Sequence, residues 1–219
     1  MSKVRAKEYQ VRIDHALATP KLQDALHKFG DAFLLAREKA FSQYDFEALR
    51  QEIADCKDEV AAHRQQYLEQ FITNAEAAGA TVYLAKTAAD ANQYIADLAR
   101  TKGVKLVTKS KSMASEETHL NQALESAGVE ALETDLGEWI IQLAGQRPSH
   151  MVMPAIHMFK EEVAELFSKV TGSVEPADIA HLVEVAREQL RQGYLDADMG
   201  ITGANVAVAE TGGIALVTN

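Results

Sequence analysis

The sequence has 219 residues, of which 47% are hydrophobic and 25% are charged, and this composition is typical of a globular protein with a substantial core. Its net charge of -10 argues against a general nucleic-acid binder, because attraction to phosphate requires a basic surface. The longest apolar stretches have the length of strands, and the N-terminus, MSKVRAKEYQVRIDH, lacks the apolar core of a signal peptide. We therefore expect a cytoplasmic protein with no membrane span and no nucleic-acid partner.

Cysteine usage limits the redox chemistry of this segment. Cys56 is the only cysteine, so an internal disulfide is impossible. One thiolate cannot hold an iron–sulfur cluster that needs four ligands. No second histidine or cysteine lies at metal-binding spacing from His157. We predict no metal site and no cofactor in this segment.

Up to about position 78 the pattern is helical. Apolar residues recur at spacings of three and four in residues 21–42 and 45–64, and a further helix is expected at about 65–78. Asp45 is placed to cap the second of these helices, and Gly79 is a natural helix C-cap. These features predict a helical N-terminal segment over residues 1–78.

From position 79 onward, short apolar runs alternate with amphipathic stretches, which is typical of βαβ units with a parallel sheet and flanking helices. We predict strands at 81–85, 104–108, 129–134 and 150–154, and helices at about 87–101, 115–127, 136–144, 157–170 and 176–192. The last stretch, ITGANVAVAETGGIALVTN, predicts two strands joined by a turn at Glu210–Gly213. Because a core-like strand then runs to within one residue of the end, we expect the 79–219 domain to be incomplete at its C-terminus.

The first candidate site follows the predicted strand VKLVT. In parallel α/β sheets, ligands bind beyond the carboxyl ends of the strands. Lys109, Ser110, Lys111 and Ser112 offer two cations and two hydroxyls that could hold an anionic group. A solvated loop in which Ser112 or Ser115 caps the next helix explains the same residues equally well.

Two further candidates follow later strands. Asp135 and Glu138 come after the strand VEALE, where a capping box explains most of the pattern and a ligand-binding carboxylate is the alternative. His157 falls near a predicted helix start, where the helix dipole favours its neutral form. A lone histidine is, however, more often a hydrogen-bonding surface residue.

The glycine-rich C-terminal stretch provides the last candidates. Glycines near Asn205 and Thr211 allow a ligand to approach the backbone closely, although tight turns explain them as well. Neither explanation accounts for Glu210, which follows the apolar run VAVA. We therefore single out Glu210 as the candidate catalytic carboxylate. P-loops, nucleophile elbows and zinc-protease helices are absent from the sequence.

Several long motifs occur together and in order: HRQQYLEQFITNAEAAGATVYLA, KSKSMASEETHLNQALESAG, VEALETDLGEWIIQLAGQRPSH, MVMPAIH and MGITGANVAVAETGGIALVTN. Over nearly the whole chain the sequence resembles the lactate utilization protein B family, which consists of LUD-domain proteins from bacterial lactate operons. The chain departs from the family pattern by ending at Asn219 and by having Met158 where relatives commonly have lysine.

This resemblance implies a LUD domain with a fold like that of sugar-phosphate isomerases and CoA transferases. It also implies a longer protein with two [4Fe–4S] clusters in a ferredoxin-like module that this chain lacks. Such a protein is an iron–sulfur electron-transfer subunit that oxidises L-lactate to pyruvate together with partner subunits. Lactate and pyruvate are carboxylates, which suits the paired lysines. Two alternatives remain, namely a CoA-transferase- or isomerase-like enzyme that uses Glu210, and a subunit-docking module.

Overall fold

A computed structural model of the protein describes residues 3–217. The chain begins with four helices: α1 (Lys3–Leu17), α2 (Pro20–Phe41), α3 (Phe46–Ala62) and α4 (Arg64–Ala77). The central part consists of α5 (Ala88–Thr101), β1 (Leu106–Lys109), α6 (Met113–Glu117), α7 (Leu120–Ser126), β2 (Glu130–Glu133), α8 (Leu136–Ala144), α9 (Lys160–Thr171), α10 (Ile179–Asp196) and β3 (Met199–Ile201). Two short strands follow, β4 (Val206–Val208) and β5 (Gly213–Ala215).

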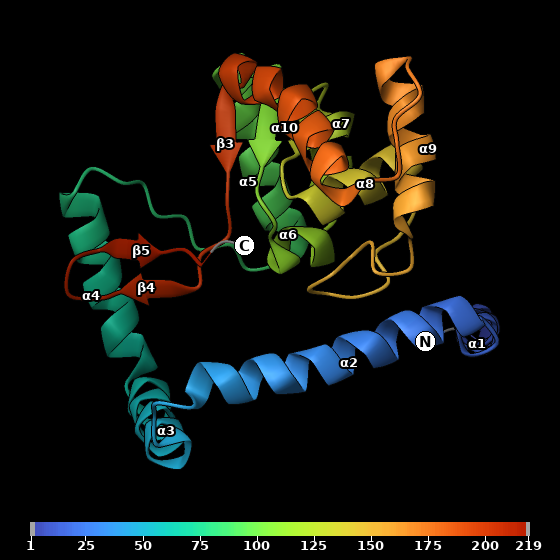
Figure 1. Ribbon diagram of the computed structural model, residues 1–219. Helices are drawn as coiled ribbons and strands as arrows, with labels where there is room; N and C mark the ends of the chain where they lie inside the picture. Colours follow the sequence, from blue (N-terminus) through green and yellow to red (C-terminus); the bar gives the residue numbers. More distant parts are fainter. Residues whose placement is uncertain (1–2, 218–219) are drawn as a thin grey trace.

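Helices α1 to α3 form a helical arm that runs beside the rest of the molecule, and α4 leads back from it (Figure 1). Pro20 occupies the start of α2, where its missing N–H is not needed, and the Asp45 carboxylate caps α3 by accepting a hydrogen bond from the N–H of Ala48 at 3.0 Å. The α2 end of the arm contacts the first turn of α9 and the segment before it, where Lys21 lies over the Phe159 ring and Phe29 packs against His150. Lys21 Nζ lies 2.5 Å from a Glu162 carboxylate oxygen. Within α2 and α3, no residue that the structure describes is buried.

Three parallel strands form the sheet in the order β2–β1–β3. The connection from β1 to β2 passes through α6 and α7, and the connection from β2 to β3 passes through α8, α9 and α10. Because β2 and β3 lie on opposite sides of β1, the order in which strands are added to the sheet reverses at β1, between β1 and β3. This is the topological switch point at which open parallel sheets leave a crevice.

Each face of the sheet is covered by its own cluster of buried apolar side chains. Helices α5 and α7 cover one face and α8 and α10 cover the other, and α9 packs against α8 and α10 (Figure 1). The first cluster comprises Ala99, Val104, Val107, Leu120, Leu124, Val129 and Ala131. The second cluster comprises Trp139, Ile140, Val163, Ala164, Phe167, Leu182, Val185, Ala186 and Leu190. We call this three-layer region, residues 88–201, the α/β layers.

Two predicted strands are wrong. Residues 81–85 pair with no strand, because Tyr83 stacks on Tyr94 of α5 and donates its hydroxyl hydrogen to Asp90, so the segment is fixed by side chains rather than by a ladder. In residues 150–154, His150 Nδ1 accepts hydrogen bonds from the N–H groups of Val152 and Met153, which curls the backbone into a turn.

Other predicted elements are confirmed with adjusted bounds. The helix expected at 136–144 is α8 itself, and the two C-terminal strands are the antiparallel pair β4 and β5. The helix expected at 115–127 is broken into α6 and α7 at His119, whose φ of 57° lies in the left-handed region. Helix α1 and strand β3 were not predicted from the sequence. The α/β fold class with a parallel sheet and flanking helices is thus confirmed, whereas the domain boundary between residues 78 and 79 stays a prediction.

Within residues 3–217, no helix is both long enough and apolar enough to cross a membrane.

Candidate functional site

A cavity of about 710 Å³ opens where β1 and β3 end. Its lining brings together the loop after β1, the loop after β2, the loop after β3 and the segment that follows β5. The lining residues include Ser110, Lys111, Ser112, Thr134, Asp135, Met151, Val152, Tyr194, Thr202, Gly203, Asn205 and Val217. This position matches the crevice expected at a topological switch point, so the fold itself places the cavity.

The loop after β1 is held against the loop after β3. The N–H of Ser110 donates to the Ile201 carbonyl at 2.9 Å, and the Ser110 hydroxyl lies 2.8 Å from the Thr202 hydroxyl. Lys111 Nζ donates to the carbonyl of Val152, which ties the loop to the 145–159 segment. These contacts keep hydroxyls and one ammonium group at the mouth of the cavity.

Two of the cavity-lining side chains also shape the local backbone. The Ser112 hydroxyl accepts a hydrogen bond from the N–H of Ser115 at 3.3 Å, so it caps α6, as one of the two interpretations of this loop predicted. The Asp135 carboxylate accepts hydrogen bonds from the N–H groups of Gly137 and Glu138 and caps α8. Both capping roles are compatible with a place in the cavity wall, because a hydroxyl and a carboxylate have further hydrogen-bonding capacity.

Beneath the loop lies a buried ionic cluster centred on Lys109, which is 0% exposed. Its Nζ lies 2.8 Å from a Glu133 carboxylate oxygen, 3.1 Å from a Glu116 carboxylate oxygen and 3.0 Å from the Ser115 hydroxyl. Asn121 donates to the same Glu133 oxygen at 2.7 Å. Since Lys109 is fully committed to these groups, Lys111 is the lysine of the predicted pair that lines the cavity.

Glu138 is buried beside this cluster, and its pKa is raised to about 7. The largest cause is burial, which penalises the charged form, and repulsion from Glu116 and Glu133 adds to it. Lys109 and Lys111 act in the opposite direction but do not compensate. A carboxyl group with this pKa exchanges a proton near neutrality, which makes Glu138 chemically the most distinctive acid near the cavity.

His157 lies apart from the cavity lining. Its Nε2 is 2.7 Å from the side-chain oxygen of Gln146, and its Nδ1 is buried without a hydrogen-bond partner among the described residues. Burial lowers the pKa of His157, while the nearby Glu162 partly opposes this shift. These surroundings keep the ring neutral at pH 7, but they connect His157 to the α2 contact with Glu162 rather than to Lys111.

The candidates of the C-terminal stretch are divided between two places. Asn205 lines the cavity, and its side-chain oxygen accepts a hydrogen bond from the N–H of Val217 at 2.8 Å. Glu210 and Thr211 lie in the exposed turn between β4 and β5, which rests on α4 through hydrogen bonds from Asn74 to the Ala209 and Glu210 carbonyls. The catalytic role of Glu210 stays a prediction, and its side chain is not part of the cavity lining.

Three functional features were missed by sequence reasoning. Glu116, Asn121 and Glu133 complete the buried cluster, and none of them was singled out from the sequence. A signal was present, because two neighbouring strands each end in a charged residue of opposite sign. The parallel register pairs Lys109 directly with Glu133, and that register could not be read from the sequence alone.

Metal chemistry has little support in the described part of the chain. Residues 3–217 contain no group of three or more histidine, cysteine, aspartate or glutamate side chains arranged to hold a metal ion. Cys56 is exposed on α3, far in sequence from the cavity residues. The residues present therefore do not fit an iron–sulfur cluster, which needs four ligands.

The fold is that of an α/β domain with a cavity at the switch point of its parallel sheet. Comparison with known proteins narrows this class: residues 68–219 match the family model described as LUD domain. The chain belongs to the LUD domain family, as the sequence motifs predicted.

Curated relatives share this similarity. The chain is 39% identical over 218 residues to "Lactate utilization protein B" of Oceanobacillus iheyensis, covering 99% of this chain and 46% of that protein. It is 49% identical over 158 residues to the protein of the same name from Shouchella clausii, covering 72% and 33%, and 38% identical over 219 residues to that from Lysinibacillus sphaericus, covering 99% and 46%. The chain thus spans about half the length of the curated relatives it matches. No solved structure matches it.

Proposed function

We propose that this chain is the LUD-domain part of a subunit that takes part in bacterial L-lactate oxidation to pyruvate, and that its cavity binds a small carboxylate. The observation that carries the proposal is the cavity at the β1–β3 switch point, where Lys111 stands among hydroxyl and amide side chains. A carboxylate is stabilised by an ammonium group and by hydroxyl donors at close range. The similarity to proteins named for lactate utilization supports this choice of ligand.

The electron-transfer part of the proposal lies outside this chain. A single cysteine cannot ligate a [4Fe–4S] cluster, so two such clusters would have to be bound elsewhere in a longer protein or in partner subunits. The test is to express the gene with its natural downstream DNA and to reconstitute the product anaerobically with iron and sulfide. Cluster absorption and electron paramagnetic resonance signals are expected, and their absence would contradict electron transfer by this protein.

The ligand part is tested by calorimetric titration of the purified chain with L-lactate and with pyruvate. We expect saturable binding that Lys111→Met weakens by roughly tenfold to a hundredfold, since a charge-assisted hydrogen bond contributes about 1.5–3 kcal/mol. Lys102→Met is the matched control, because it removes the same charge from the exposed end of α5. Equal affinities of wild type and Lys111→Met, or no binding by the wild type, would contradict the proposal.

A role in subunit docking is the second candidate, and the surface of the helical arm favours it. Phe33, Leu34 and Leu35 of α2 are exposed large apolar side chains in consecutive positions. Monomeric proteins seldom leave such a group uncovered. Deleting residues 1–78 should then abolish co-purification with partner subunits encoded nearby, and unchanged co-purification would remove this role.

A further inference from the structure

A second cavity of about 380 Å³ lies along α10, next to the first. We call it the α10 groove. It is lined by Thr134, Leu136, Val183, Ala186, Arg187, Leu190, Arg191, Tyr194 and Leu195. Its volume falls within the range of small-molecule sites in proteins, and its lining combines aliphatic side chains with a few polar groups, as such sites do. Thr134, Leu136 and Tyr194 belong to the walls of both cavities.

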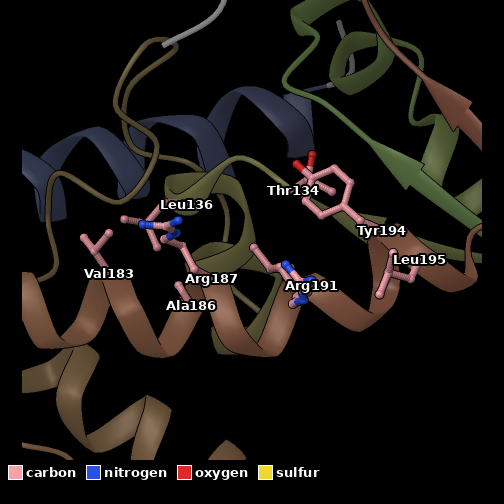
Figure 2. Close-up of a pocket in the computed structure, with 9 residues that line it drawn as sticks. Thr134, Leu136, Val183, Ala186, Arg187, Arg191, Tyr194 and Leu195 are labelled. Atoms are coloured by element: carbon pink, nitrogen blue, oxygen red, sulfur yellow. The ribbon is translucent and has the colours of Figure 1, made fainter.

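The groove contains two arginines, and we find no partner for either among the residues that the structure describes. Neither Arg187 nor Arg191 forms a hydrogen bond or an ion pair with any residue that the structure describes. They are one helical turn apart, and Figure 2 shows the Arg187 side chain reaching towards Leu136 and the Arg191 side chain lying against α10. Like charges at this spacing repel each other, so an anion between them would remove an unfavourable interaction.

The remainder of the lining is apolar. Ala186 and Leu190 are buried and form the base of the groove, whereas Leu136 and Val183 stand partly exposed at its sides. An apolar group laid along α10 would cover these side chains and leave the arginines at one wall. Two neighbouring guanidinium groups without a partner within residues 3–217 are notable in a chain with a net charge of -10, and their planar geometry matches a carboxylate.

From these observations we infer that the α10 groove is a binding site for an amphipathic carboxylate, whose anionic end is held by Arg187 and Arg191 and whose aliphatic body lies over Ala186, Leu190 and Val183. This site differs from the small-carboxylate cavity in its cations and in its apolar base. It does not use Lys111, and the proposed lactate site does not use Arg187 or Arg191. Substitutions of Arg187 and Arg191 should therefore change binding in the α10 groove, and substitution of Lys111 should change binding in the small-carboxylate cavity.

The test is a calorimetric titration of the chain with butanoate, hexanoate and octanoate. We expect affinity to rise with chain length, by up to about fourfold for each CH₂ group that becomes buried. Replacing both arginines, Arg187→Gln with Arg191→Gln, should weaken octanoate binding by at least about tenfold, since charge-assisted bonds to the carboxylate are lost. The control is Arg50→Gln with Arg64→Gln, which changes the net charge equally on exposed parts of α3 and α4.

A second variant tests the apolar half of the site. Val183→Trp fills the side of the groove while both arginines remain, so octanoate binding should fall and the dependence on chain length should flatten. Lys111→Met should leave octanoate affinity unchanged. The inference is overturned if wild type shows no saturable octanoate binding, if the double arginine variant binds as tightly as its control, or if affinity does not depend on chain length. None of these results would bear on the proposal that the first cavity binds L-lactate, which its own titration tests.

Discussion

In the α/β layers each face of the sheet is covered by buried apolar side chains, whereas α2 and α3 of the helical arm contain no buried residue. Within α2 the contrast runs along one helix: Leu22, Leu26 and Phe29 are half-buried where the helix faces the 145–162 segment, and Phe33 is exposed. The apolar residues of α2 continue at helical spacing beyond the last residue that packs against the 145–162 segment. Amphipathicity therefore determines that a helix forms, and the presence of a neighbour determines how much it stabilises the fold.

Breaking the buried ionic cluster should have the largest effect on the α/β layers. Lys109→Met leaves the buried Glu133 and the partly exposed Glu116 without their cation, and we expect a loss of about 3–5 kcal/mol in the free energy of unfolding. Urea denaturation followed by Trp139 fluorescence measures this loss. Lys102→Met, on the surface, should stay close to wild type. A loss below about 1 kcal/mol for Lys109→Met would mean that the cluster does not support the sheet.

Glu138 gives the α/β layers a dependence of stability on pH. Its pKa is raised from 4.5 to about 7, so the folded state holds a proton that the unfolded state releases. Stability from this group is present below pH 4.5 and is lost as the pH rises through 7. At about 1.4 kcal/mol for each pKa unit, the loss amounts to roughly 3 kcal/mol.

The matching variant is Glu138→Gln, which stays neutral at all pH values. Its stability relative to wild type should increase by about 2–3 kcal/mol between pH 5 and pH 8, measured by urea denaturation at each pH. Glu130→Gln, at an exposed position of β2, is the control. A difference between Glu138→Gln and wild type that does not change with pH would show that Glu138 is ionised in the folded protein.

The β4–β5 turn depends on a close approach to α4. A Cβ atom on Gly212 would lie 2.2 Å from the Ala75 backbone nitrogen, and the φ of Gly212 is +71°. Gly212→Ala should therefore cost about 1–3 kcal/mol and release the turn, which increased amide hydrogen exchange at residues 206–215 would reveal. Gly30→Ala in α2 has open space and should stabilise the protein by about 0.5–1 kcal/mol. Unchanged exchange in Gly212→Ala would argue against the α4 contact.

The smallest effect is expected within the helical arm. Leu34 is 61% exposed, so Leu34→Ser should change the free energy of unfolding by less than about 0.5 kcal/mol. Leu124 of α7 is 0% exposed, and Leu124→Ala should cost about 2–5 kcal/mol. If thermal and urea denaturation gave both variants a similar loss, the distinction between the arm and the layers would fail.

The sequence predicted the elements whose signals are local. Asp135 marks the start of α8, and the turn between β4 and β5 follows from its glycines. The sequence could not predict β3, a three-residue strand that forms by pairing with β1, next to Asp198, which accepts hydrogen bonds from the N–H groups of Lys105 and Leu106. Such long-range pairing leaves no periodic pattern.

The candidate site was predicted in the same uneven way. The rule that ligands bind beyond parallel strands singled out Ser110, Lys111 and Ser112, which line the cavity, and their binding of a ligand stays a prediction. The rule could not show that Lys109 is buried in ion pairs. Successive side chains of a strand point to opposite faces of the sheet, but the sequence does not say which face each one occupies. Nor could it reveal the α10 groove, since Arg187 and Arg191 look like ordinary surface charges in the sequence.

The central claim, that a small carboxylate binds where β1 and β3 end, is tested most directly by nuclear magnetic resonance titration of the ¹⁵N-labelled chain with L-lactate. The account predicts saturable shift changes concentrated in the amides of residues 110–112 and 202–205. Shift changes confined to other parts of the chain, or none at all, would contradict it.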